Sequence, residues 1–146
     1  MIELFTDGAC RGNPGPGGWG VLIRRNGQDR DLSGSARETT NNRMELMAAI
    51  EGLAMLEDGS VVSLTTDSQY VGQGITQWVH TWKRNGWKPS TKQPVKNQDL
   101  WQRLDDQTQR LSISWFWVKG HSGHLENERA DQLANQAIDQ MLAAAS

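Results

Sequence analysis

The sequence has little cysteine and no long apolar run, and both absences exclude whole classes of protein. Cys10 is the only cysteine in the 146 residues, so the chain can form neither an internal disulfide nor a cysteine-based zinc site. This favours the reducing cytoplasm. No segment is apolar and long enough to span a bilayer, and residues 1–7 do not have the pattern of a secretion signal. We expect one domain over residues 1–146, and a monomer without an obligate protein partner.

Acidic residues are absent from one long stretch of the chain. The formal net charge of −2 argues by itself against a nucleic-acid partner. Between Ser68 and Gln98, however, there is no Asp or Glu, and this stretch carries the cations Lys83, Arg84, Lys88, Lys92 and Lys96. Tryptophans accompany these cations, at Trp78, Trp82, Trp87 and Trp101. Such a segment is either a helix pair anchored in the core by its tryptophans, or a basic ridge that follows a phosphate backbone.

The N-terminal residues predict three antiparallel strands. Residues 2–6 alternate apolar and polar side chains and lead into Asp7 and Gly8, which predicts a strand ending in a turn. Residues 19–25 and 29–38 predict the second and third strands, and the polar third strand suits a sheet edge. Residues 8–18 are rich in glycine and proline, so we expect them to form the loop between the first two strands.

The remainder predicts helices alternating with two more strands. Helical spacing covers residues 41–57, 68–85 (as one helix or two), 98–110 and 125–142, with a break at 86–94. Strand patterns cover residues 61–66 and 111–118. A crossover helix before residues 61–66 places that strand parallel to the first and close to it. The prediction is an α/β fold with a five-stranded mixed sheet, three antiparallel strands and then two parallel, flanked by helices.

Four carboxylates occupy positions that this fold could bring together. Asp7 and Asp67 follow two neighbouring parallel strands, and Glu45 and Asp131 lie at the margins of apolar helix faces. Each has an ordinary explanation, as a turn residue, a helix cap or a solvated helix position. Four like charges in one place, however, require compensating cations, and hard divalent ions prefer oxygen ligands. Joint placement therefore favours a metal site, of the kind that cleaves phosphodiesters with two ions.

Two histidines compete for a role in proton transfer. His121 and His124 both lie in a glycine-containing loop between the last strand and the last helix, close to Asp131. An imidazole there could move protons for the attacking water or the leaving oxygen. Histidines in such loops are more often bystanders, and the residues alone do not separate the two candidates.

Polar side chains near the predicted metal site are suited to contact sugars. They are Asn13, Asn41, Asn42 and Gln69. Two asparagines before a helix are often a capping arrangement. Near a metal site they could instead recognise a ribose 2′-hydroxyl, which distinguishes RNA from DNA.

Taken together, these motifs resemble bacterial type 1 ribonuclease H over essentially the whole chain. The resemblance rests on Thr6-Asp7-Gly8-Ala9-Cys10 with the glycine-rich run from Gly12 to Gly18, Thr40-Asn41-Asn42-Arg43-Met44-Glu45-Leu46, Thr66-Asp67-Ser68-Gln69-Tyr70-Val71, and Trp117-Val118-Lys119-Gly120-His121 with Glu126-Asn127-Glu128. It implies an endonuclease that hydrolyses the RNA strand of RNA/DNA hybrids with two Mg²⁺ ions, Mn²⁺ being a possible substitute, and leaves 5′-phosphate and 3′-hydroxyl ends.

The resemblance also implies roles for individual residues. Metal ligands would be Asp7, Glu45, Asp67 and Asp131, with His121 handling the proton. The minor groove of the hybrid would be contacted by Cys10, Asn13, Asn41, Asn42 and Gln69. A phosphate of the DNA strand would be held by Thr40, Arg43 and Asn97. The acid-free segment resembles a basic protrusion that lies along the DNA strand, with Trp78, Trp82, Lys83, Arg84, Lys88 and Trp101 as contacts.

Three other functions fit parts of the pattern. Recombinases, transposases and resolvases share this architecture with acidic sites that act on DNA, and cleavage of an all-DNA duplex would identify them. A hybrid-binding module without catalysis would not need four acids. A sugar-kinase-like ATPase also begins with an acidic strand and a glycine-rich hairpin, but its site requires two lobes and a longer chain.

Overall fold

The computed structural model describes residues 1–87, 95–119 and 124–144. Its strands are β1 (Ile2–Cys10), β2 (Gly15–Arg25), β3 (Gln28–Thr39), β4 (Val61–Thr66) and β5 (Ser112–Trp117). Its helices are α1 (Asn41–Ala54), α2 (Gln69–Gln73), α3 (Val79–Arg84), α4 (Gln98–Arg110) and α5 (Leu125–Ala144), with a π-helical turn η1 (Gly74–Trp78) between α2 and α3. The predicted order of strands and helices is confirmed.

The five strands form one mixed sheet in the order β3-β2-β1-β4-β5. Strands β1, β2 and β3 pair antiparallel, whereas β4 is parallel to β1 and β5 is parallel to β4. The predicted fold class is therefore confirmed, with β3 at one edge. The parallel ladder of β1 and β4 ends at the pair Thr6 and Thr66, although β1 itself continues beside β2. The residues that follow this pair, Asp7 and Asp67, come from neighbouring strands at the same end of the sheet.

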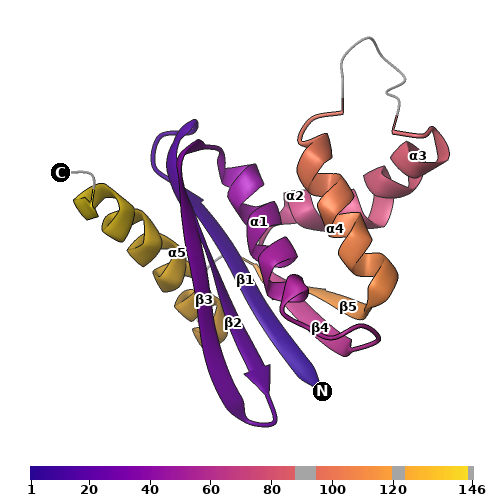
Figure 1. Cartoon of the computed structure of the whole chain (residues 1–146), viewed down its shortest axis with the longest axis horizontal. Helices are drawn as coiled ribbons and strands as arrows, with labels where there is room; N and C mark the ends of the chain where they lie inside the picture. Colours follow the sequence, from indigo (N-terminus) through magenta and orange to yellow (C-terminus); the bar gives the residue numbers. More distant parts are fainter. Residues whose placement is uncertain (88–94, 120–123, 145–146) are drawn as a thin grey trace.

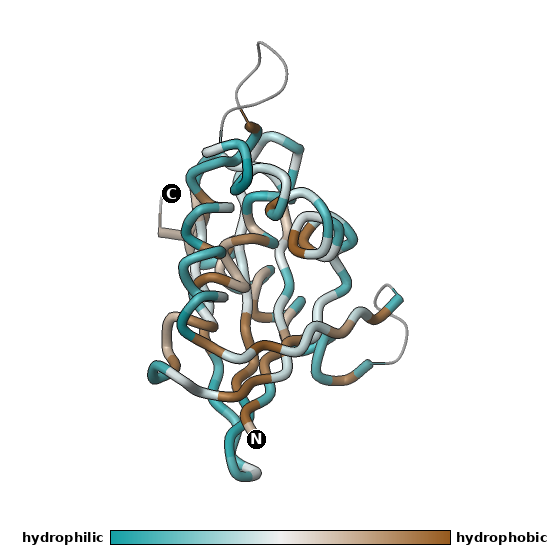
Figure 2. The backbone as a smooth tube through the Cα atoms, turned by 90° about the vertical axis from the view of Figure 1, so that its right-hand side faces the viewer, coloured by the Kyte–Doolittle hydropathy of each residue, from teal (hydrophilic) through white to brown (hydrophobic). Residues whose placement is uncertain are grey.

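Helices cover both faces of the sheet (Figure 1). Helix α5 packs on β1, β2 and β3, while α1 packs on the other face, where α4 contacts α1 and β5. Buried side chains of the sheet, α1 and α4 form the main core, including Leu4, Val21, Leu53, Leu64 and Leu104. Figure 2 shows apolar segments running through the middle of the molecule, with hydrophilic segments on the outer turns. Burial of these side chains is the main source of stability.

The expected loop over residues 8–18 was wrong, because most of these residues belong to strands. Strand β1 continues to Cys10 and β2 begins at Gly15. The glycines of β2 are needed for packing: a Cβ at Gly18 would lie 2.3 Å from the carbonyl oxygen of Ala134, and one at Gly20 would lie 2.2 Å from that of Ala130. Helix α5 therefore rests directly on the backbone of β2. This close approach is what glycine within a strand allows.

Helix boundaries differ from the sequence predictions by a few residues. Helix α1 ends at Ala54 and not at residue 57. The helical stretch predicted for residues 68–85 is α2, η1 and α3 in direct succession. Most of the predicted break at 86–94 lies outside the described residues. Among the helices that the structure describes, none combines the length and apolarity needed to cross a bilayer.

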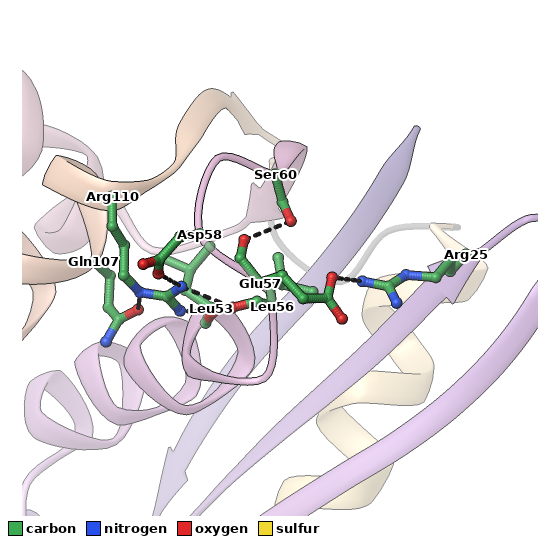
Figure 3. Close-up of polar contacts among 8 residues, drawn as sticks. All are labelled: Arg25, Leu53, Leu56, Glu57, Asp58, Ser60, Gln107 and Arg110. Atoms are coloured by element: carbon green, nitrogen blue, oxygen red, sulfur yellow. Dashed lines mark hydrogen bonds and ion pairs between the residues drawn. The ribbon is translucent and has the colours of Figure 1, made fainter.

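Arg110 ties the end of α4 to the end of α1 (Figure 3). Its guanidinium donates to the carbonyl oxygens of Leu53 (2.8 Å) and Leu56 (2.7 Å), and it pairs with Asp58 at 2.9 Å. Carbonyls at a helix C-terminus lack partners within the helix and carry partial negative charge, so a cation stabilises them. Because α1 has no basic residue in its own last turn, this cation is supplied by α4.

We expect Arg110→Ala to lower the free energy of unfolding by roughly 2 to 3 kcal/mol, because two charged hydrogen bonds to buried carbonyls are lost. Arg103→Ala is the matched control, since Arg103 also joins α4 to α1, but through an exposed pair with Glu51 at 3.0 Å and a weak contact with Met47 Sδ at 3.6 Å. That change should cost less than about 1 kcal/mol. Urea denaturation of both variants checks this. Equal losses would contradict the role given to Arg110.

Candidate metal centre and nucleic-acid face

Three of the four predicted acids meet at the end of the parallel β1–β4 ladder. Asp7 lies in β1, Glu45 in the second turn of α1, and Asp67 directly after β4. Carboxylate oxygens of the three lie within 4.8 Å of one another. Asp7 is 3% exposed and Glu45 is 5% exposed. An all-oxygen donor set of this kind suits a hard divalent cation.

The contact between Gly8 and α1 brings Glu45 to Asp7. A Cβ at Gly8 would lie 2.5 Å from the backbone nitrogen of Glu45, so the helix packs directly on the bare strand. The backbone N–H of Gly8 donates to Asp7 Oδ1 at 2.9 Å and also to a carboxylate oxygen of Glu45. One backbone group thus holds both side chains in place.

The ordinary explanations proposed for these acids do not apply. Asp7 is not in a turn, and Glu45 is buried instead of solvated. Asp67 is not the cap of α2, because Ser68 fills that position and its hydroxyl accepts from the backbone N–H of Val71 at 3.1 Å. The three carboxylates are thus brought together without serving as a turn or cap residue.

The cluster is electrostatically costly without a cation. Burial, followed by the charges of Glu45 and Asp67, raises the pKa of Asp7 far above its usual range. Burial and the charge of Asp67 likewise raise the pKa of Glu45. Both shifts mean that the site binds positive charge, either protons or a metal ion.

Asp131 lies at the margin of this cluster. It follows Ala130 on α5, at the point where that helix rests on Gly20, and Gly20 is the partner of Asp7 across β1 and β2. Its charge also contributes to the raised pKa of Asp7. Its Oδ1 accepts from the amide of Asn135 at 3.3 Å, and it does not belong to the group of three within 4.8 Å. The fourth acid therefore faces the cluster from the opposite helix layer.

The structure gives His124 a structural position, whereas His121 lies outside the described residues. The Nδ1 atom of His124 accepts from the backbone N–H of Asn127 at 3.3 Å, at the start of α5. Asn127 is buried and its amide reaches the carbonyl oxygen of Thr6 at 3.4 Å, so it ties α5 to β1 beside Asp7. Sequence reasoning missed this role, and the only signal for it was the motif Glu126-Asn127-Glu128.

Polar side chains predicted to contact sugars line an open cavity next to the acids. The cavity has a volume of about 290 Å³, and its lining includes Asn41, Asn42 and Gln69 together with the three acids. Thr40 is the cap of α1, accepting from the backbone N–H of Arg43 at 3.3 Å, so the capping explanation for the two asparagines was wrong.

Asn13 and Cys10 lie beside the first turn of α1. The side-chain oxygen of Asn13 accepts from the backbone N–H of Asn41 at 3.0 Å. The thiol of Cys10 is 3.4 Å from the carbonyl oxygen of Thr39, next to the helix cap. All five predicted groove residues are thus near the start of α1 or α2.

Thr40, Arg43 and Asn97 also come together, on the α4 side of α1. The Arg43 guanidinium donates to Asn97 Oδ1 at 3.2 Å and forms two hydrogen bonds with Asp99, at 3.0 and 2.8 Å. The amide of Asn97 donates to the Tyr70 hydroxyl at 3.0 Å. The predicted phosphate site is therefore an ordered network, and Asp99 is a member that sequence reasoning missed.

The tryptophan-rich region is anchored in the core by Trp101, as one of the two explanations predicted. Trp101 is 0% exposed, packs against Tyr70, Trp78 and Trp82, and donates to the Tyr70 hydroxyl at 3.1 Å. A buried indole has no surface to offer, so the expected direct contact of Trp101 with nucleic acid was wrong. Trp78 and Trp82 are only half-buried.

The cations of this region are not all unopposed. Lys83 pairs with Asp105 of α4 at 3.3 Å, a carboxylate that the acid-free sequence window does not reveal. Arg84 and Lys96 are exposed, and Lys88 and Lys92 lie outside the described residues.

Comparison with known proteins places the chain among ribonucleases. The family model RNase H matches residues 1–139. A ribonuclease H of Hydrogenovibrio crunogenus is 63% identical over 140 residues, covering 96% of this chain and 97% of that protein. A ribonuclease HI of Pseudomonas putida is 61% identical over 142 residues, covering 97% of this chain and 96% of that protein.

Solved structures of RNase H1 proteins share the fold of this chain. LC9-RNase H1, described as a type 1 RNase H with the type 2 active-site motif, superimposes with a TM-score of 0.84 at 37% identity, covering 95% of this chain and 72% of that one. LC11-RNase H1, solved in complex with an RNA/DNA hybrid, gives a TM-score of 0.74 at 27% identity, covering 97% of this chain and 99% of that one. The chain belongs to the RNase H family of ribonucleases.

Proposed function

We propose that this protein is an endonuclease that hydrolyses the RNA strand of RNA/DNA hybrids, with residues 1–146 acting as one catalytic domain. The observation that carries the proposal is the cluster of Asp7, Glu45 and Asp67, three carboxylates from separate elements within 4.8 Å. Such a cluster is suited to cations that act on a phosphodiester. The hybrid as substrate is supported by LC11-RNase H1, whose fold this chain shares and which was solved with a hybrid.

The donor set fits two Mg²⁺ ions, with Mn²⁺ as a possible substitute. Asp7, Glu45, Asp67 and Asp131 would hold them, since all four offer oxygen ligands and the first two are deprotonated readily only beside a cation. Bound ions supply an activated water and neutralise the charge that develops on the scissile phosphate, with 5′-phosphate and 3′-hydroxyl ends as products. The backbone N–H of Gly8 anchors two of the carboxylates, Asp7 and Glu45, so these ligands are held in place before a cation binds.

His121 is proposed to move a proton to or from the reacting oxygens. Its rival His124 is occupied at the start of α5, where its Nδ1 accepts from Asn127. This contact holds the ring of His124 at the start of α5 but involves only Nδ1, so the choice of His121 rests on its position in the motif Lys119-Gly120-His121.

Both strands of a hybrid have candidate contacts. The cavity residues Asn41, Asn42 and Gln69, with Cys10 and Asn13 beside them, would read the minor groove and its 2′-hydroxyls. Thr40, Arg43 and Asn97 would hold a phosphate of the DNA strand. Trp78, Trp82, Lys83, Arg84 and Lys88 would extend this contact along the same strand. We expect the enzyme to act as a monomer in the cytoplasm.

Cleavage of an end-labelled RNA/DNA hybrid tests the proposal directly. We expect the RNA strand to be cut with Mg²⁺ and not with EDTA, while matched DNA duplex, RNA duplex and single-stranded RNA stay intact. Asp67→Asn should bind the hybrid but cut it about a thousandfold more slowly, because one metal ligand is lost. Asp106→Asn, an exposed carboxylate on α4, is the control with the same charge change.

Each other outcome of this assay identifies an alternative. Cutting of the DNA duplex would indicate a resolvase-like enzyme, and binding without cutting would indicate a hybrid-binding module. Undiminished cleavage by Asp67→Asn would refute the metal assignment.

The raised pKa values of Asp7 and Glu45 predict a pH-dependent stability of the metal-free protein. The folded state holds these protons more tightly than the unfolded state, so the contribution of these two groups to stability is greatest below the usual carboxyl pKa of about 4 and falls as the pH rises. Asp7→Asn avoids the cost of protonating Asp7 in the folded state, so it should raise the free energy of unfolding near neutral pH by about 1 to 2 kcal/mol.

Added Mg²⁺ should make the wild type more stable than Asp7→Asn. It binds only the folded wild type well, so it should stabilise the wild type far more than Asp7→Asn. Denaturation curves from acidic to neutral pH, with EDTA and with Mg²⁺, measure both effects. A variant less stable than the wild type in EDTA at neutral pH would show that repulsion in the cluster is not the dominant cost.

The pairing of Lys83 with Asp105 predicts unequal roles for two neighbouring cations. Arg84→Ala should reduce the slope of log affinity against log salt by up to about 0.9, the value for one phosphate contact. Lys83→Ala should reduce it less, because Asp105 already neutralises much of this charge. Titration of a fluorescent hybrid at several NaCl concentrations in EDTA measures the slopes. Equal reductions would mean that Asp105 does not shield Lys83.

A further inference from the structure

Arg43 has two partners of different chemistry. Asn97 is neutral and accepts one hydrogen bond, at 3.2 Å. Asp99 is anionic and accepts from both terminal nitrogens, at 3.0 and 2.8 Å, in a two-pronged arrangement. A carboxylate and a phosphodiester present the same pair of oxygens to a guanidinium, so a phosphate could take the place that Asp99 holds.

Asp99 can leave this place at little cost. Its side chain is 63% exposed, against 34% for Arg43, so it covers the guanidinium from the solvent side. It also lies in the first turn of α4, where a negative charge is stabilised by the helix dipole without any help from Arg43. The Arg43 hydrogen bonds lower the pKa of Asp99, and after separation the ordinary carboxyl pKa of about 4 still leaves it ionised at neutral pH.

The charges of the site require Asp99 to leave Arg43 before a phosphate can bind there. Of the three residues proposed to hold the DNA phosphate, Thr40 and Asn97 are neutral and only Arg43 is charged. A phosphate that met the intact Arg43–Asp99 pair would find no net positive charge and a carboxylate beside it. Attraction requires that the carboxylate withdraw.

We propose that Asp99 is a built-in competitor of the substrate, occupying on Arg43 the position that a phosphate of the DNA strand takes in the complex. This inference rests on the proposed function. Asp99 weakens binding of every polyanion at this site, but a hybrid that is also held at the metal centre and the groove residues can displace it. A ligand that contacts Arg43 alone cannot displace Asp99. The residue therefore favours selectivity over affinity.

Asp99→Asn tests this, with Asp106→Asn as its control. Asp106 is an exposed carboxylate seven residues along α4, two turns away on the same face, so it reproduces the charge change but not the contact with Arg43. Binding of a fluorescent hybrid is measured in EDTA by anisotropy at several NaCl concentrations. Asp99→Asn should bind about two- to fivefold more tightly than Asp106→Asn at low salt, as expected for loss of an exposed ion pair.

The salt dependence separates competition from general electrostatics. When a phosphate binds Arg43 it releases its condensed cations; in the wild type the freed Asp99 carboxylate attracts cations in turn, whereas Asp99→Asn has no such offset, so the slope should steepen by up to about 0.9. The gain should vanish when Arg43→Ala is combined with Asp99→Asn. The affinity for a DNA duplex should increase in Asp99→Asn at least as much as the affinity for the hybrid, because the variant is less selective.

The opposite result is equally clear. If Asp99→Asn binds no better than Asp106→Asn, or binds worse with a shallower slope, then Asp99 supports Arg43 and does not compete with the substrate. That outcome, with wild-type binding and cleavage intact, overturns this inference alone. A wild-type protein that neither binds nor cuts the hybrid overturns the proposed function and this inference with it.

Discussion

The close approach of α1 to β1 at Gly8 is the constraint on which the candidate metal centre depends. Because Gly8 has no side chain, the backbone of Glu45 occupies the space next to the strand, 2.5 Å from where a Cβ would be. The same residue donates its N–H to both Asp7 and Glu45. The register of the sheet places Asp67 beside Asp7, since the β1–β4 ladder ends at the pair Thr6 and Thr66, one residue before each aspartate. Backbone packing sets the spacing of Asp7 and Glu45, and sheet register places Asp67 at the first residue after β4.

This spacing opposes folding, and other parts of the molecule compensate for it. Two buried carboxylates and the half-buried Asp67 repel one another, as the raised pKa values of Asp7 and Glu45 show. The apolar core around α1 and the Arg110 contacts at the C-terminal end of α1 stabilise the fold. Conflict between local energy and global fold is typical of functional sites, because cation binding depends on the same charges that destabilise the empty cluster.

Sequence periodicity predicted the order of the elements because apolar spacing is a local property, and it placed the four acids on the right elements. It failed wherever a residue acts through a partner distant in the sequence. Gly18 was assigned to a loop because the helix that rests on it lies more than a hundred residues further on. Asp105 was missed as the partner of Lys83, and Trp101 was taken for a surface residue, because both depend on how α4 packs. The explanation of Asp67 as the N-cap of α2 was wrong, because Asp and Ser are equally good caps in sequence. Only the structure shows that Ser68 is the cap.

The first turns of α1 connect the two halves of the proposed substrate site. Glu45 points to β1 and the metal centre, whereas Arg43 points to α4 and its Asn97–Asp99 network. Two residues apart, these side chains lie on opposite sides of one helix. The separation between the metal centre and the phosphate site is therefore fixed by a rigid element. A duplex can engage both only if its two strands match that separation, so α1 would select by groove geometry before any single hydrogen bond reads a sugar.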